Sequence, residues 1–168
     1  LSFLGCSYVD SDFSYPYNAL QVAHVKGYKE VVIELVKAGA DVKILYNNLP
    51  LVYYYAADKN TLRLFVKHGA SVNETTKIGC GMLVLALHHE HFDIAENLIE
   101  AGADVHQTDE TGKLRPLMLA AYQGKTELVK MLLKKGARVN DSCEIGSALT
   151  FAAIQGHLEV VKLLVASG

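Results

Sequence analysis

Residues 148–164 read Ala148-Leu149-Thr150-Phe151-Ala152-Ala153-Ile154-Gln155-Gly156-His157-Leu158-Glu159-Val160-Val161-Lys162-Leu163-Leu164. Apolar residues on both sides of Gly156 recur at the three- and four-residue spacing of amphipathic helices. Glycine tolerates the left-handed backbone with which helices commonly end. The stretch therefore predicts two helices joined by a tight turn.

The same pattern recurs along the chain at a nearly constant interval. Four segments share an apolar residue, two variable residues, Gly-Ala, one variable residue and Val, and they occupy residues 36–42, 66–72, 99–105 and 133–139. Their glycines at 39, 69, 102 and 136, with Gly168 in the same phase, are separated by 30, 33, 34 and 32 residues. A period of this length is typical of stacked repeats. We predict that each repeat contains a helix, a turn, a second helix and an extended loop.

Small and large apolar residues occupy different positions of the repeat. Ala120–Ala121 and Ala152–Ala153 allow the first helices of neighbouring repeats to approach closely. The second helices carry an apolar face formed by Leu128, Val129, Leu132 and Leu133, and by Val160, Val161, Leu163 and Leu164. One helix pair cannot bury that face alone, so stacking of neighbours is expected. Both Leu132 and Leu163 are predicted to be buried.

Two segments match a known consensus. Residues 115–121 followed by Gly124, and residues 148–153 followed by 156–161, are similar to the T-P-L-H-x-A and G-H-x-E-V-V segments of ankyrin repeats. Residues 17–168 resemble this family, with five matches in register. The resemblance implies an all-α fold, an ankyrin-type helix-turn-helix solenoid with hairpin-like loops between repeats.

The repeat positions define the expected organisation. We predict a single ankyrin repeat array over residues 1–168, with repeats at approximately 11–43, 44–73, 74–106, 107–140 and 141–168. The segment from Cys6 to Asp10 aligns with the segment from Gly39 to Lys43, one repeat length of 33 residues later. Residues 1–10 are therefore interpreted as the end of a preceding partial repeat. A coincidental five-residue match is the alternative. The chain does not begin with Met and lacks obvious polar capping repeats, so we expect the array to continue at both ends.

The second repeat departs most from the pattern. Alignment on Leu49-Pro50-Leu51 places Tyr54 and Tyr55 at the position of the alanine pair, with one residue deleted later. Alignment on Ala56–Ala57 instead requires a deletion of about three residues. We prefer the first alignment because the second disturbs the helix more. A local distortion is expected from Tyr53 to Ala57.

Composition excludes several classes of protein. Hydrophobic residues make up 51% of the chain and the net charge is −2, which argues against disorder and against nucleic-acid binding driven by bulk charge. No apolar run is long enough to span a membrane. Three widely separated cysteines fit a reducing compartment, so we expect a cytoplasmic protein.

No catalytic or metal-binding pattern is found in the sequence. His88, His89 and His91 include no pair spaced four residues apart, so we interpret them as structural or surface residues. His24 and His68 have no partner predicted by their spacing. Nucleophile, zinc-protease and phosphate-loop motifs are absent. We therefore predict no enzyme activity, no cofactor, no metal and no small-molecule substrate.

Tyrosine is the unusual component, with nine copies and no tryptophan. Tyrosine is enriched in interface hot spots. Ankyrin-like proteins bind partners through hairpin tips and the concave face of their first helices, and the resemblance selects Tyr15, Tyr17, Lys26, Tyr46, Asn48, Tyr54, Tyr55, Ile78, His88, His89, Lys113, Leu114, Tyr122 and Gln123. We predict a protein–protein interaction scaffold. The alternative is a regulatory or substrate-docking ankyrin segment of a larger enzyme or multidomain protein.

Overall fold

The computed structural model describes residues 18–168. Tyr15, Tyr17 and the partial repeat expected at residues 1–10 lie outside the described residues. The chain divides into two compact units, an N-terminal unit that ends at Ser71 and a C-terminal unit that extends from Val72 to Gly168. Each unit is described by itself.

The N-terminal unit contains two helix pairs and one short hairpin. Its elements are α1 (Ala19–Val25), α2 (Lys29–Lys37), β1 (Leu45–Tyr46), β2 (Leu49–Pro50), α3 (Leu51–Tyr54) and α4 (Lys59–Lys67). In the antiparallel hairpin, Tyr46 lies opposite Leu49. Asn47 and Asn48 between them have φ values of 48° and 64°. Asparagine tolerates this backbone, which two-residue hairpin turns require, so Asn48 forms the turn as well as its exposed tip.

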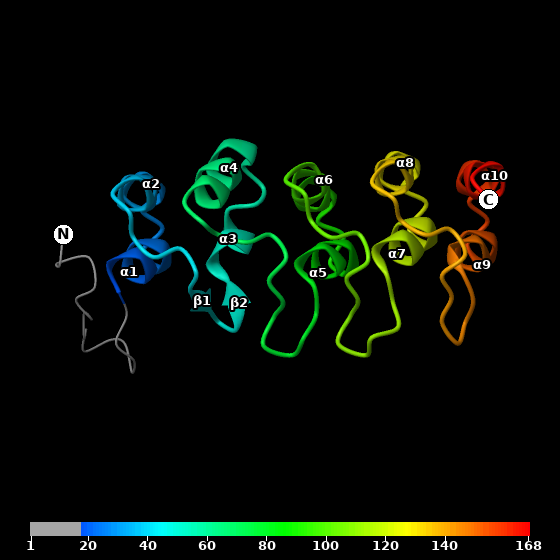
Figure 1. Cartoon of the computed structure of the whole chain (residues 1–168), viewed down its shortest axis with the longest axis horizontal. Helices are drawn as coiled ribbons and strands as arrows, with labels where there is room; N and C mark the ends of the chain where they lie inside the picture. Colours follow the sequence, from blue (N-terminus) through cyan, green and yellow to red (C-terminus); the bar gives the residue numbers. More distant parts are fainter. Residues whose placement is uncertain (1–17) are drawn as a thin grey trace. The chain divides into compact units, whose positions relative to one another are not determined.

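The C-terminal unit contains three helix pairs, and Figure 1 shows their arrangement. The first helices are α5 (Met82–His88), α7 (Pro116–Tyr122) and α9 (Ala148–Ile154), and the second helices are α6 (Phe92–Glu100), α8 (Thr126–Lys134) and α10 (Leu158–Ala166). Hairpin-like loops precede the first helices, with isolated bridges between Thr75 and Gly81 and between Ser142 and Ser147. The predicted helix-turn-helix solenoid with hairpin-like loops is confirmed.

Small residues fill the core between first helices. Ala120, Ala121 and Ala152 are fully buried, as the close approach of α7 and α9 requires. The side chain of Leu132 on α8 is also fully buried. The prediction for Leu163 was wrong, because Leu163 on α10 is only half-buried, whereas its neighbour Leu164 is 1% exposed.

The second repeat is shortened between its two helices. Its N-caps, Pro50 and Asp58, are eight residues apart, whereas the N-caps Arg115 and Lys125 of the fourth repeat are ten apart. As a result α3 has four residues and the other first helices have seven. The expected distortion is therefore found, but the preferred alignment was one residue out of register, because Pro50 precedes α3 whereas Pro116 is the first residue of α7.

Candidate protein-binding surface

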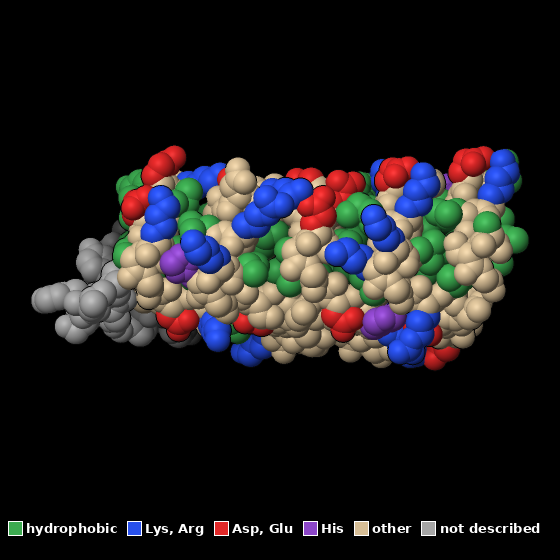
Figure 2. All heavy atoms as spheres, turned by 45° about the horizontal axis from the view of Figure 1, so that its top comes forward, with side chains coloured by type: hydrophobic (Ala, Val, Ile, Leu, Met, Phe, Trp, Pro, Cys, Tyr) green, Lys and Arg blue, Asp and Glu red, His purple; other side chains and the backbone are tan. Residues whose placement is uncertain are grey.

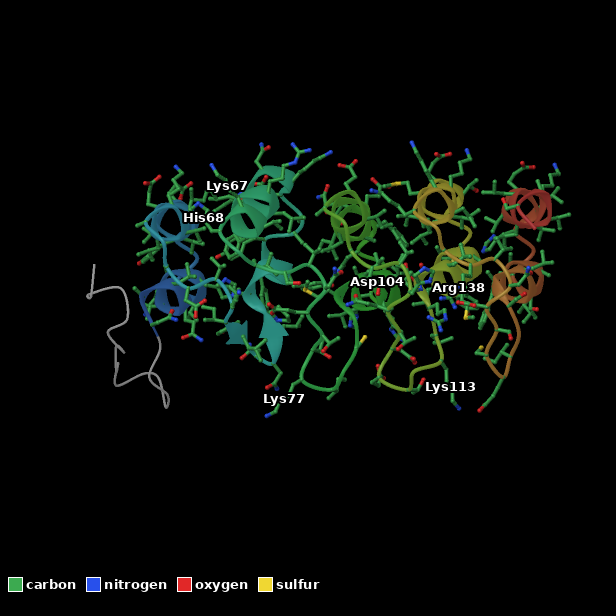
Figure 3. All side chains as sticks on the ribbon, in the orientation of Figure 1. Lys67, His68, Lys77, Asp104, Lys113 and Arg138 are labelled. Atoms are coloured by element: carbon green, nitrogen blue, oxygen red, sulfur yellow. The ribbon has the colours of Figure 1, made fainter. Side chains whose placement is uncertain are left out.

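The hairpin loops of the C-terminal unit expose apolar side chains. Ile78 and Ile145 are 69% and 61% exposed, and both lie in loops that lead into a first helix. Figure 3 shows Lys77 and Lys113 at the ends of two of these loops. The Lys113 ammonium forms an ion pair of 2.5 Å with Glu144 of the next loop. The loops therefore combine exposed apolar tips with polar links between neighbours.

A buried carboxylate shapes the loop before α7. Asp109 is 8% exposed, and its carboxylate accepts hydrogen bonds from the Thr111 hydroxyl and from the backbone amides of Lys113 and Leu114. Burial opposes ionisation of Asp109, yet these hydrogen bonds hold the pKa of its carboxyl below the ordinary value. Leu114 is half-buried, and because its amide donates to Asp109, its backbone has a structural role in addition to any contact with a partner.

The ends of the first helices expose a second group of predicted residues. Tyr122 is 45% exposed and packs edge-on against Phe151 at a centroid distance of 6.2 Å. Gln123 is half-buried, and its side-chain amide donates to the carbonyl of Leu87 at 2.5 Å. The His157 imidazole in turn lies 2.9 Å from the carbonyl of Tyr122. Side chains of the following repeat thus satisfy carbonyls at the ends of α5 and α7.

Three exposed histidines gather where α5 ends and α6 begins. The rings of His88 and His89 have centroids 5.8 Å apart, and those of His89 and His91 are 6.0 Å apart. Glu90, which lies between them in the turn, has φ 58°. In the corresponding turns of the next two repeats this position is a glycine, Gly124 or Gly156. Within residues 18–168, no group of three or more His, Cys, Asp or Glu side chains could hold a metal ion.

The tyrosines of the N-terminal unit surround a histidine. The centroid of the His24 ring lies 4.7 Å from that of Tyr46, 4.7 Å from that of Tyr54 and 5.6 Å from that of Tyr55. The Tyr55 hydroxyl is 3.0 Å from His24 Nδ1, and the Tyr54 hydroxyl donates to the Tyr46 carbonyl at 3.3 Å. Tyr55 also stacks on buried Phe65, at 5.0 Å. These residues are called the tyrosine cluster below: His24, Tyr46, Tyr54 and Tyr55.

Partial burial shifts the pKa values of three side chains in this cluster, in each case towards the neutral form. Desolvation lowers the pKa of His24, which keeps the imidazole neutral. Desolvation also raises the pKa of Tyr55, and desolvation and the nearby Tyr46 raise that of Tyr54. The cluster is therefore an uncharged aromatic surface at neutral pH, of which Tyr54 is 38% exposed.

Asp58 lies beside the cluster in an open pocket of about 360 Å³. Its carboxylate accepts from Lys29 Nζ at 2.7 Å and caps α4 through the amides of Asn60 and Thr61. The Thr61 hydroxyl donates to the same carboxylate at 2.9 Å. The hydrogen bond from Lys29, followed by that from Thr61, lowers the pKa of Asp58 to about 2.

We expect Asp58→Ala to reduce the free energy of unfolding by about 1 kcal/mol at neutral pH, because α4 loses its N-cap. The folded-state pKa is depressed, so this contribution is present above pH 4 and is lost as the pH falls towards about 2. Denaturant unfolding at several pH values measures it. Lys29→Ala should cost much less than Asp58→Ala, since the ion pair is exposed. Equal losses would show that the ion pair, rather than the cap, stabilises α4.

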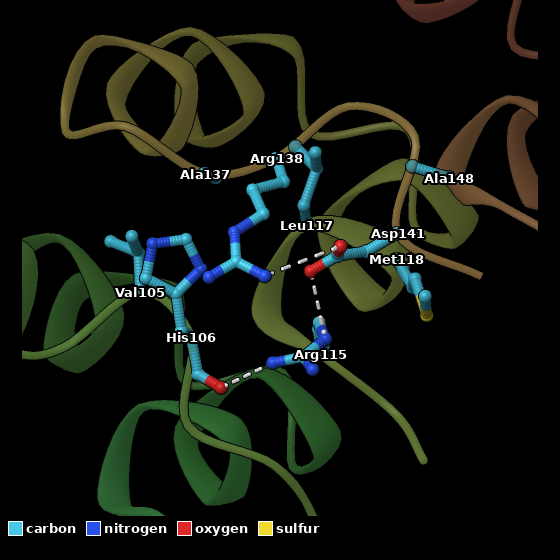
Figure 4. Close-up of a pocket in the computed structure, with 9 residues that line it drawn as sticks. All are labelled: Val105, His106, Arg115, Leu117, Met118, Ala137, Arg138, Asp141 and Ala148. Atoms are coloured by element: carbon cyan, nitrogen blue, oxygen red, sulfur yellow. Dashed lines mark hydrogen bonds and ion pairs between the residues drawn. The ribbon is translucent and has the colours of Figure 1, made fainter. Parts of the chain in front are cut away.

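A small pocket beneath the loops of the C-terminal unit contains two arginines, as Figure 4 shows. Arg115 Nε lies 3.0 Å from the Asp141 carboxylate, and Arg115 Nη1 donates to the His106 carbonyl at 2.6 Å. Arg138 approaches the same carboxylate at 3.9 Å. The pocket volume of about 10 Å³ suits one water molecule at most. These groups therefore link loops of neighbouring repeats and leave no room for a small-molecule ligand in this pocket.

Within the N-terminal unit, the structure brings together three of the residues selected from the sequence: Tyr46, Tyr54 and Tyr55. Lys26 is exposed next to this cluster in sequence, at the end of α1. Sequence analysis missed His24, whose partners lie in other elements, and Ile145. Ile145 could have been found from the alignment of its loop with the loop that contains Ile78.

Comparison with known proteins identifies the family. A family model described as ankyrin repeats (3 copies) matches residues 20–109 and 83–168. The chain therefore belongs to the ankyrin repeat family. Ankyrin repeats are generally protein-interaction modules and are typically non-catalytic.

Three relatives show how this chain compares with longer proteins. It is 29% identical over 123 residues to the ankyrin repeat protein YahD of Escherichia coli, covering 71% of this chain and 61% of YahD. It is 31% identical over 156 residues to the ankyrin repeat and KH domain-containing protein mask-1 of Caenorhabditis elegans, covering 89% of this chain and 6% of mask-1. A human relative, transient receptor potential cation channel subfamily A member 1, is 33% identical over 84 residues, 50% of this chain and 7% of the channel. The chain thus spans less than two thirds of each relative. None of the helices among residues 18–168 is long and apolar enough to cross a membrane.

Proposed function

We propose that this chain is a protein-binding scaffold that recognises a partner protein through its hairpin tips and the exposed ends of its first helices. The observation that carries the proposal is the exposure of large apolar side chains there, with Ile78 at 69%, Ile154 at 61% and Tyr122 at 45%. Exposed apolar groups of this size gain free energy when a partner covers them. The tyrosine cluster adds rings that lose little conformational entropy on binding, because neighbouring rings already fix them.

To test this proposal, peptides that bind the whole chain are selected from a displayed peptide library. We expect Ile78→Ser and Tyr122→Ser each to weaken the selected binders by roughly tenfold or more, as hot-spot residues do. Fluorescence anisotropy with labelled peptides measures the affinities.

Val165→Ser on α10 is the matched control, because Val165 is an apolar residue with 63% exposure on a second helix. It should change affinity by less than about twofold. Binders that respond to Val165→Ser and tolerate both other variants would place recognition on the second helices and contradict the proposal.

A second proposal is that the repeats are a docking segment of a larger enzyme or multidomain protein. The small fraction of mask-1 that the chain spans, 6%, supports it. The sequence of the complete gene product tests it, since an adjoining catalytic or channel domain would favour this second function.

A further inference from the structure

Helix α4 differs in charge from the other second helices. It contains Lys59, Arg63 and Lys67 and no Asp or Glu. The four-residue spacing places these three side chains on the same side of the helix. Arg63 and Lys67 are exposed, and neither forms an ion pair with another residue in the range 18–168.

Three other second helices each pair one lysine with a glutamate of the same helix. In α2, α8 and α10, a lysine pairs with the glutamate three residues earlier, through Lys37–Glu34 at 2.6 Å, Lys130–Glu127 at 2.7 Å and Lys162–Glu159 at 2.8 Å. Residues 18–71 contain seven basic and four acidic side chains, although the whole chain has a net charge of −2. The unpaired positive charge of Arg63 and Lys67 thus adds to a local basic excess of the N-terminal unit.

A groove of about 450 Å³ runs between α2 and α4. Lys29, Ile33 and Lys37 line it from α2, at positions four residues apart. Asn60 and Leu64 line it from α4. Lys67 follows Leu64 by three residues, so it continues this side of α4 in the last helical turn, where Figure 3 labels it.

The groove has an apolar floor. Its two lysines, Lys29 and Lys37, are paired with carboxylates, so the unpaired positive charge near it belongs to α4. Ile33 and Leu64 are half-buried and leave part of their apolar surface in the groove. The ion pair between Lys29 and Asp58 lies at the end where α4 begins. Figure 2, which brings the second helices forward, shows basic side chains over α4. In Figure 1, α2 and α4 lie on the side of the N-terminal unit away from the hairpin β1–β2. The groove adjoins the pocket beside the tyrosine cluster at one end, because Lys29 and Asp58 line both.

We propose that the groove between α2 and α4, together with Arg63 and Lys67 on the exposed side of the same helix α4, docks an acidic segment of a partner protein that also carries aliphatic side chains. The aliphatic groups cover Ile33 and Leu64, and the carboxylates pair with Arg63 and Lys67. Arginine can bind a carboxylate through two parallel hydrogen bonds. Glu30 lines the α2 side, so the segment's carboxylates face α4 rather than α2.

The probe for this proposal is a labelled synthetic peptide that repeats Leu-Glu-Glu-Ser four times, with a Leu-Gln-Gln-Ser peptide as its uncharged counterpart. We expect the whole chain to bind the acidic peptide at least about tenfold more tightly than the uncharged one, with an affinity that falls as salt is added. The double variant Arg63→Gln and Lys67→Gln should remove this preference. Circular dichroism confirms that the variant remains folded.

A matched control is available on α8. Lys130 and Lys134 occupy the same helical positions as Arg63 and Lys67, and the double variant Lys130→Gln and Lys134→Gln removes the same charge. Its peptide affinity should stay within about twofold of the wild type. Equal losses in both double variants, or no preference for the acidic peptide, would overturn the proposal. Tighter binding to phosphatidylserine vesicles or to a single-stranded oligonucleotide would also overturn it, by assigning α4 to another class of partner.

Discussion

Leu132→Ala is expected to lower the free energy of unfolding by about 3–4 kcal/mol. The Leu132 side chain is fully buried on α8, which packs against both α6 and α10 in the C-terminal unit. Truncation would leave a cavity that neighbouring helices cannot close without disturbing their own packing. Denaturant unfolding followed by circular dichroism measures the loss.

Leu163→Ala is the informative comparison. Leu163 occupies the position in α10 that corresponds to Met131 in α8, and both are half-buried. Since less apolar surface is lost, the expected cost is about 1 kcal/mol. Similar losses for Leu132→Ala and Leu163→Ala would contradict the burial pattern.

Gly124→Ala should cost about 2–3 kcal/mol, although it adds only one carbon atom. Gly124 has φ 67°, a conformation that costs other residues about 1 kcal/mol. In addition, a Cβ at this position would lie 2.6 Å from His157 Nδ1, so the imidazole that bonds the Tyr122 carbonyl must move. Loss of that hydrogen bond adds about 1 kcal/mol.

Gly136→Ala separates the two effects. Gly136 has φ 91°, but a Cβ there would meet no atom within 4 Å. It should therefore cost only the backbone strain, about 1 kcal/mol. If the variants are equally destabilised, His157 does not restrict Gly124. His157→Ala in combination with Gly124→Ala should cost less than the sum of the single changes, because the steric conflict is already relieved.

The periodic part of the sequence predicted the fold because every repeat has to meet the same packing and turn requirements. Small residues such as Ala120 must separate first helices, and glycines such as Gly102 must adopt a positive φ after second helices. The shortened α3 was harder to align because, counted from the N-cap, Tyr55 stands where Ala120 stands in the fourth repeat, so the alanine pair that marks the register elsewhere is incomplete. Only the positions of the caps, Pro50 and Asp58, define the missing residues.

The candidate surfaces were predicted less completely, because their partners are distant in the sequence. His24 and Tyr55 are 31 residues apart, and no local spacing indicates that their side chains meet. Gln123 was selected as a contact residue from its position in the repeat. Its side-chain amide instead donates a hydrogen bond to the carbonyl of Leu87, 36 residues earlier. Exposure distinguishes Ile78 from buried aliphatic residues, and exposure depends on how the loops fold.

The hydrogen bonds from side chains to the backbone carbonyls at the ends of α5 and α7 affect how such a chain can change in length. Each donor, Gln123 or His157, belongs to the repeat that follows its acceptor. A gene duplication that copies one complete repeat therefore copies the donor for the repeat before it. A duplication whose length is not a whole number of repeats would separate donors from acceptors, so growth in whole repeats is the route that keeps these two hydrogen bonds.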